Sequence, residues 1–267
     1  MKHKIDPTVD CVFKAVLGKE ENIPLLMHFL NAVLKLEGDA RITAVTILNP
    51  YNEKEFETDK LSVVDVKAMS AQGVSYQIEI QRAVHAGLTS RILYTWSAIY
   101  HALLKEGEPY SQLAPVISIW LLKENLFPEV NAYHLLFAPY SLEHGLCLTD
   151  HLAIHLLQLP KWRLSEKRVD ETDRWMYFFT EGQEVDLDHL PDILNTKEMR
   201  QAMKVLERFS ENQKNYLLYE QRLDAERVEL TWKAMLEQER QAKEYERQEK
   251  ERLLALLRKA GIDPQHP

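Results

Sequence analysis

The sequence predicts an α/β protein with a mixed β-sheet flanked by helices and a long helical C-terminal extension. Helix-like and strand-like apolar patterns alternate through residues 1–160, which indicates helices packed on one sheet. The longest apolar run covers residues 113–122, a length that suits a buried strand and is too short to span a bilayer. Glycine and proline are absent from residues 192–260, so no helix breaker interrupts that segment. We therefore expect a core of residues 1–160 and a helical extension of residues 161–267.

The core elements are expected in the order helix, helix, three strands, helix, two strands. The second helix has the clearest pattern, because Leu25, Phe29 and Val33 form one apolar stripe and Gly38 follows its end. The segment 150–159 fits either a helix or a strand. The expected helices are 6–17, 21–36 and 88–104, and the expected strands are 42–48, 61–68, 74–81, 116–122 and 132–138.

The charge balance restricts the classes of nucleic-acid protein that the chain can represent. Lys and Arg total 33 against 41 Asp and Glu, which gives a formal net charge of -8. This excludes a basic coat that binds nucleic acid by phosphate neutralisation alone, but not an enzyme that meets phosphate through a metal ion. Two cysteines, Cys11 and Cys147, cannot build a disulfide framework, and the first ten residues lack the apolar segment of a signal peptide. We therefore expect a cytoplasmic protein without a membrane partner.

The residues that suggest chemistry lie on the predicted hairpin of strands 61–68 and 74–81. Asp65 occupies the middle of LSVVDVKA, which is apolar at both parities like a strand covered on both faces. A carboxylate there costs several kcal/mol unless it is paired or binds a metal. The next strand alternates, so Glu79 and Gln81 share one face about 7 Å apart.

A turn centred on Ala71 would pair Asp65 with Gln77 and make Asp65 and Glu79 diagonal neighbours on one face. Two carboxylates and an amide suit Mg²⁺, which can polarise a phosphodiester and activate the attacking water. The same alternation fits the solvated face of a half-exposed strand, with Asp65 paired to Lys14, Lys60 or Lys67. The spacing alone leaves both interpretations open.

Several stretches, taken in order, match one known family. They are DCVFK at 10–14, DKLSVVDVKA at 59–68, YQIEIQ at 76–81, SRILYTWSAIY at 90–100, EGEPYSQLAPVISIWLL at 106–122 and the ending LLALLRKAGID. On these residues the chain resembles the Rpn-like PD-(D/E)XK nuclease family transposases, also called recombination-promoting nucleases. The resemblance spans nearly the whole chain and implies a restriction-endonuclease-like core. It also implies DNA cleavage with Mg²⁺, Mn²⁺ being an alternative, and a role in DNA recombination or transposition.

The resemblance implies roles for the hairpin residues. Asp65 would be the metal-binding Asp of the motif, and Glu79 the acidic residue of the (D/E)-x-K element. Gln81 stands where the wider superfamily has Lys, and this family commonly carries Gln there. An amide cannot take a proton near neutral pH, so we expect Gln81 to position water or phosphate. Lys67 is two residues from Asp65 and therefore on the same face of the strand. It is a candidate to replace the Lys that the wider superfamily has at the position of Gln81.

Two further residues are candidates outside the hairpin. Asp10 matches the family's early acidic position and would add a metal ligand, although it fits the start of a helix equally well. Arg91, on the helix after the hairpin, is a candidate for contact with DNA phosphate.

The end of the chain predicts self-association. The segment 237–252 is almost entirely charged or polar, and four leucines follow it closely at 253, 254, 256 and 257. Such a patch needs a partner, either a second subunit or the body of its own chain, and we expect a homodimer.

A second hypothesis about function is a catalytically inactive nuclease-fold assembly protein that acts through its helical C-terminal region. It is motivated by Gln81 and by the acidic balance of residues 1–160, which carry 13 basic and 18 acidic side chains for a net charge of -5.

Overall fold

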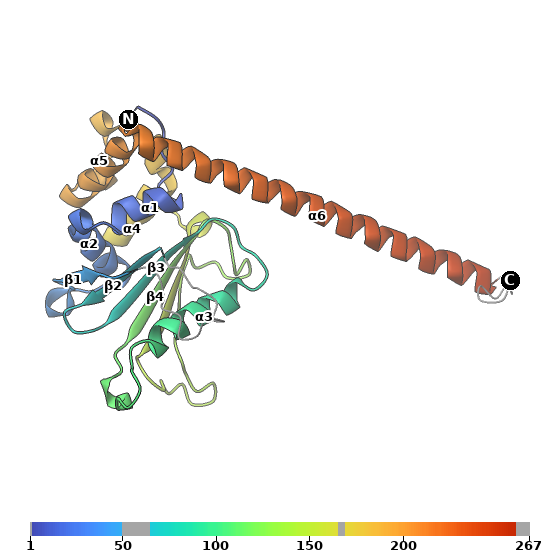
Figure 1. Cartoon of the computed structure of the whole chain (residues 1–267), viewed down its shortest axis with the longest axis horizontal. Coiled ribbons are helices and arrows are strands. Elements are labelled where there is room, and N and C mark those ends of the chain that lie inside the picture. Colours follow the sequence, from blue (N-terminus) through green and yellow to red (C-terminus); the bar gives the residue numbers. More distant parts are fainter. Residues whose placement is uncertain (1, 50–64, 165–168, 260–267) are drawn as a thin grey trace. The chain divides into compact units, whose positions relative to one another are not determined.

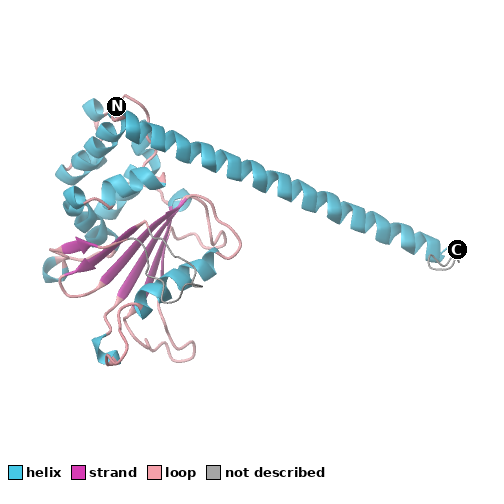
Figure 2. Cartoon of the chain, viewed as in Figure 1, coloured by secondary structure: helices cyan, strands magenta, loops and turns pink. Residues whose placement is uncertain are grey.

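The computed structural model describes residues 2–49, 65–164 and 169–259. The chain divides into two compact units, Met1–Tyr219 and Glu220–Pro267. The first unit holds a sheet with helices packed on it, and the described part of the second unit, up to residue 259, belongs to one long helix (Figure 2). The first unit extends past the expected boundary at residue 160, because the helices between residues 171 and 211 pack against those near the N-terminus.

A six-stranded mixed sheet forms the centre of the first unit and confirms the predicted fold class. Its strands lie in the order β1-β2-β3-β4-β6-β5, in which β3, β4 and β6 are parallel and the other pairs are antiparallel. The ambiguous segment 150–159 is a strand. The strands are β1 Val45–Ile47, β2 Val66–Ser70, β3 Ser75–Gln81, β4 Val116–Leu122, β5 His134–Phe137 and β6 Leu152–Gln158.

Helices cover both faces of the sheet, as Figure 1 shows. On one face lie α1 Asp10–Leu17, α2 Ile23–Val33, α4 Glu171–Glu181 and α5 Lys197–Glu211; on the other lies α3 Leu88–His101. Short 3₁₀ turns connect these elements at Glu20–Asn22, Gly38–Ala40, Tyr110–Gln112, Leu159–Lys161, Gly182–Glu184, Leu187–His189 and Asp192–Leu194.

Each face of the sheet has its own apolar core. On the face of α1 the core is aromatic: Phe29 packs edge-on against Trp175 with ring centroids 5.4 Å apart, and Phe179 stacks on the same indole at 5.9 Å. On the other face, α3 contributes Leu88 and Ile92 to a cluster that is completed by Trp120, Leu122, Ile154 and Leu156. This second cluster fixes α3 over β4, next to the candidate site.

Some element boundaries differ from the sequence prediction for identifiable reasons. The first helix begins at Asp10 rather than at residue 6, because the Asp6 carboxylate accepts hydrogen bonds from the backbone N–H and hydroxyl of Thr8 and holds these residues in a turn. Beyond Pro191 the chain forms two α-helices rather than one, α5 and α6 Gln213–Lys259, because Asn212 is extended. Helix α6 has 47 residues and is about 70 Å long. None of the described helices is both long and apolar enough to cross a membrane.

Candidate active site

The hairpin of β2 and β3 brings the two predicted carboxylates opposite each other. The register pairs Val66 with Ile78 and Lys67 with Gln77. Continued by one residue, it places Asp65 directly across from Glu79, whereas the sequence had predicted that Asp65 faces Gln77. The predicted pairing is therefore wrong by two residues.

The turn explains this difference. Its left-handed residue is Gly73, with φ 83°, and the Gly73 N–H donates to the Ser70 carbonyl at 3.0 Å. The turn is thus centred one residue later than Ala71, which moves each pairing by two positions. Because side chains alternate with a period of two, this even shift leaves both carboxylates on the predicted face.

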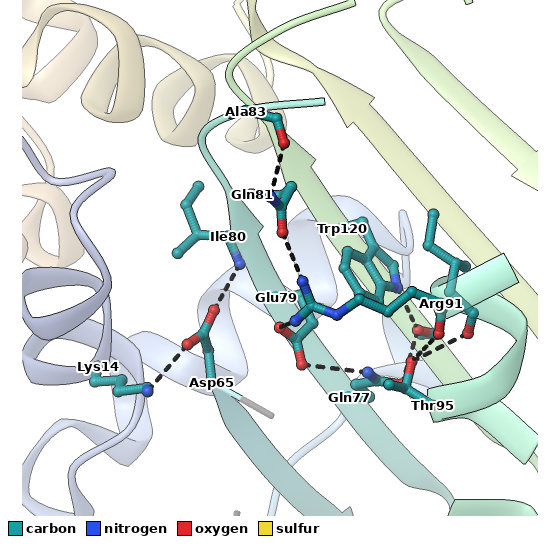
Figure 3. Close-up of polar contacts among 12 residues, drawn as sticks. Lys14, Asp65, Gln77, Glu79, Ile80, Gln81, Ala83, Arg91, Thr95 and Trp120 are labelled. Carbon is teal, nitrogen blue, oxygen red and sulfur yellow. Dashed lines mark hydrogen bonds and ion pairs between the residues drawn. The ribbon is translucent and has the colours of Figure 1, made fainter. Parts of the chain in front are cut away.

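Asp65 is held by two contacts at the start of β2. Its Oδ2 accepts a hydrogen bond from the Ile80 N–H at 2.9 Å, and its Oδ1 lies 3.0 Å from Nζ of Lys14 on α1 (Figure 3). Lys14 is one of the three partners that the spacing allowed; Lys60, another, lies outside the described residues. The carboxylate is thus oriented from both α1 and β3.

Glu79 is the least well compensated charge in the site. It is 2% exposed, Gln77 Nε2 donates to its Oε1 at 3.3 Å, and Arg91 Nη2 lies 3.7 Å from its Oε2. Burial and the nearby charge of Asp65 raise the pKa of Glu79 to about 8, although Gln77 and Arg91 act in the opposite direction. A buried carboxylate that lies opposite a second carboxylate forms a donor set that suits a cation.

Gln81 and Arg91 contact each other at the end of β3. Arg91 Nη1 donates to Gln81 Oε1 at 2.9 Å, and Gln81 Nε2 donates to the Ala83 carbonyl at 2.7 Å. The Arg91 guanidinium lies over the Trp120 ring, 5.4 Å from its centroid. Arg91 therefore points into the site, where the sequence had suggested only a contact with DNA phosphate.

Gln77 is a functional candidate that the sequence reasoning missed. It is fully buried, and its Oε1 accepts from Ser118 Oγ at 3.0 Å, which in turn accepts from Trp120 Nε1 at 2.8 Å. This chain of hydrogen bonds orients the Gln77 amide so that its NH₂ group faces Glu79. The available signal was its place in the alternating strand, on the same face as Glu79 and Gln81.

Lys67 and Asp10 lie less centrally than the two carboxylates. Lys67 on β2 is paired with Gln77 on β3. Gln77 lies four residues before Gln81, so Lys67 is about 13 Å from Gln81 along the strand direction. Asp10 is the first residue of α1, and its carboxylate accepts from the Cys11 N–H at 2.7 Å. Within residues 2–49, 65–164 and 169–259, no group of three or more His, Cys, Asp or Glu side chains is placed to hold a metal ion. The structure thus does not bring Asp10 into a three-carboxylate set with Asp65 and Glu79.

A second buried carboxylate, Asp6, lies just beyond the ends of β3 and β4. Its Oδ2 accepts from Arg82 Nη1 at 2.7 Å and from Lys123 Nζ at 2.5 Å, and its Oδ1 accepts from Thr8. Burial alone would raise the pKa of Asp6, but the hydrogen bonds from Arg82, Lys123 and Thr8 hold it at about 2.

Comparison with known proteins identifies one family. A family model described as PD-(D/E)XK nuclease family transposase matches residues 7–239. Searches of the curated proteins and of the solved structures gave no match. The matched region includes all six strands and the residues of the candidate site.

Proposed function

Because the chain belongs to the PD-(D/E)XK nuclease family transposases, we propose that it is a metal-dependent DNA endonuclease that acts in DNA recombination or transposition. The observation that supports this most directly is the buried Glu79, opposite Asp65 and beside the Arg91 guanidinium. Nucleases of this family generally use divalent metal ions. A buried carboxylate with a raised pKa beside a second carboxylate is an arrangement that marks functional sites.

The metal is proposed to be Mg²⁺, with Mn²⁺ as an alternative, held by Asp65 and Glu79. These oxygen donors suit a hard cation that keeps several waters. When bound, such an ion would polarise the phosphodiester and promote ionisation of water. The Ile80 N–H and Lys14 orient the Asp65 carboxylate, and Gln77 orients that of Glu79.

The proposed reaction is hydrolysis of a phosphodiester. The oxygen of water forms a new bond to phosphorus, the bond from phosphorus to one sugar oxygen breaks, and that oxygen gains a proton while the water loses one. Arg91 is proposed to contact the phosphate, where a guanidinium offsets the charge of the pentavalent transition state and cannot act as a base.

Nicking of supercoiled plasmid tests this proposal. The purified protein is expected to nick and linearise DNA with Mg²⁺ or Mn²⁺ and not with EDTA. Asp65→Ala is expected to lower the rate at least about 100-fold, since even outer-shell partners of a metal typically cost 10–100-fold. Asp39→Ala, which removes an exposed carboxylate from a surface turn, serves as the matched control. Equal cleavage by wild type and Asp65→Ala would contradict a nuclease site at this position.

The alternative function is a catalytically inactive assembly protein. It is favoured by the amide at position 81 and by the ion pair that Arg91 already makes with Glu79. Calorimetry separates the two, because the endonuclease is expected to bind Mg²⁺ or Mn²⁺ without DNA. Absence of binding at millimolar metal would support the assembly function.

We also propose that the protein forms a homodimer through the leucines near the end of α6. Two subunits would bring two active sites to a duplex, as cleavage of both strands requires. Burial of one leucine contributes about 1.5–3 kcal/mol, so four clustered leucines favour association. Light scattering is expected to give twice the mass of the chain, and truncation after Gln238 is expected to restore a monomer. A full-length monomer at micromolar concentration, unchanged by the truncation, would exclude this dimer.

A further inference from the structure

The E-x-Q element lacks the lysine of the (D/E)-x-K motif, and the structure places a cation there from another element. We infer that Arg91 of α3 supplies the positive charge of the active site, and that Gln81 is a positioning residue that holds Arg91 in place. This inference rests on the proposed nuclease function and adds to it an assignment for both residues. Three sets of contacts support it.

The first is the orientation of the Gln81 amide. Its NH₂ group donates to the Ala83 carbonyl at 2.7 Å, so its oxygen must face the other way, toward Arg91 Nη1 at 2.9 Å. A backbone carbonyl can only accept, and a guanidinium can only donate, so this amide satisfies both neighbours in one orientation alone. Gln81 is therefore engaged as an acceptor for Arg91. A lysine at this position could not take that role.

The second is the way Arg91 itself is fixed. Its guanidinium contacts Gln81, lies 3.7 Å from Glu79 and covers the ring of Trp120, whose own Nε1 is tied to Ser118. The side chain is nevertheless 39% exposed. Only one of its five N–H groups makes a hydrogen bond to another described residue. Contacts with Gln81, Glu79 and Trp120 thus hold the Arg91 guanidinium in place. Its other N–H groups can still donate to phosphate oxygens.

The third is the position of the other basic residues near the hairpin. Lys14 makes its ion pair with Asp65, and Arg82 donates to Asp6. Lys67 lies opposite Gln77 and about 13 Å along the strand from Gln81. Arg91 contacts both acidic and amide residues of the E-x-Q element: it lies 3.7 Å from Glu79 and donates to Gln81. We therefore assign the cation to Arg91 rather than to Lys67, which the sequence had suggested.

The assignment predicts that restoring the common motif damages the enzyme. Gln81→Lys would replace the acceptor for Arg91 by a second cation, so we expect cleavage to fall about 10-fold or more. Arg91→Gln alone is expected to lower cleavage about 100-fold, as the loss of a preorganised donor to the transition state typically does. The double variant Gln81→Lys with Arg91→Gln places the cation at position 81 and the amide at position 91. We expect it to be at least ten times more active than Arg91→Gln alone.

The experiment measures plasmid cleavage by wild type, the two single variants and the double variant. Ser97→Lys, which adds the same charge to an exposed position of α3, is the matched control and is expected to retain wild-type activity. Circular-dichroism melting curves establish that each variant is folded. Gln81→Lys at or above wild-type activity, or a double variant no better than Arg91→Gln, would overturn the assignment.

Metal binding gives a readout that does not depend on cleavage. Mn²⁺ is titrated into each full-length variant without DNA. Because the guanidinium near Glu79 repels a cation, Arg91→Gln is expected to bind Mn²⁺ equally or a few-fold more tightly while its cleavage falls. If Arg91 served only to hold the carboxylates in place, affinity would fall together with cleavage, and the assignment would fail.

Different results would contradict the nuclease function and the assignment of the cation to Arg91. If wild type does not cleave DNA, or if Asp65→Ala cleaves equally well, the nuclease function fails and the assignment of Arg91 fails with it. If wild type cleaves DNA through Asp65 and the exchange of residues 81 and 91 does not restore activity, only the assignment is lost.

Discussion

Two buried carboxylates, Asp6 and Glu79, lie near the same end of β3 in opposite electrostatic conditions. Both are nearly inaccessible, with 7% and 2% exposure. Asp6 accepts hydrogen bonds from two cationic side chains, and these hold its pKa at about 2 despite burial. Glu79 faces another carboxylate, has one cation at 3.7 Å, and has a pKa raised to about 8 by burial and by Asp65.

This fold thus compensates the buried charge of Asp6 strongly and that of Glu79 only in part. The same sheet end carries Arg82 and Lys123, yet both side chains are directed to Asp6. A buried carboxylate whose charge is only partly balanced costs stability, and groups with such perturbed pKa values cluster at functional sites. Asp6 is thus a carboxylate whose charge the fold balances, and Glu79 is one whose charge it balances only in part.

The largest effect on stability is expected at Asp6. Asp6→Asn removes the buried negative charge that both Arg82 and Lys123 contact, so we expect a loss of about 3–5 kcal/mol in the free energy of unfolding. Chemical denaturation at pH 7 measures this, with Asp39→Asn as the control at an exposed turn. A change as small as that of the control would show that the Asp6 cluster is not structural.

A smaller effect of opposite sign is expected at Glu79. Glu79→Gln removes a charge that the folded state disfavours, so in EDTA we expect stability at pH 8 to rise by about 1–2 kcal/mol while cleavage is lost. Between pH 4.5 and pH 8 the folded state holds the proton that the unfolded state releases, so wild-type stability falls as pH rises. The variant does not titrate, and its advantage should therefore shrink at pH 5. An equal advantage at both pH values would refute the raised pKa.

At acid pH we expect the contribution of Asp6 to stability to be lost. The pKa of Asp6 is depressed, so its contribution is present above pH 3.8 and is lost as pH falls toward 2. The stability gap between wild type and Asp6→Asn is therefore expected to close over this range. Denaturant titrations at pH 4, 3 and 2 measure it. A gap that stays constant would mean that Arg82 and Lys123 do not depend on the Asp6 charge.

The smallest effect is expected at the exposed ion pair of Glu239 and Lys243 on α6. Their nitrogen and oxygen lie 2.6 Å apart, but both groups are fully solvated. We expect Lys243→Ala to leave the melting temperature without measurable change, because water and salt screen such pairs. A clear loss of stability would indicate that this part of α6 is not solvated as a lone helix is.

Local patterns in the sequence predicted most of the first unit. The alternation of YQIEIQ and the apolar run at 113–122 identified β3 and β4, and parity placed Asp65 and Glu79 on one face even though the register was wrong by two. Their proposed roles stay predictions. The start of α1 was misplaced because the turn of Asp6 depends on a side chain bonding locally to Thr8.

The long-range contacts of the site lay beyond that reasoning. Asp6 meets Arg82 and Lys123 across 76 and 117 residues, and no periodicity predicts such a cluster. The sequence suggested Arg91 only as a phosphate contact, because its approach to Gln81 depends on how α3 packs over Trp120. Tertiary packing determines which basic side chain contacts which carboxylate.

The packing of α3 also sets when the site is complete during synthesis of the chain. Asp65, Glu79 and Gln81 leave the ribosome before Arg91, and Trp120, on which the guanidinium rests, follows about thirty residues later. A nascent chain that has formed only the β2–β3 hairpin carries both carboxylates without the cation. It also lacks β4, which orders α3 through Leu88 and Ile92. The candidate site thus gains its full set of charged groups only after the central strands of the sheet have been made.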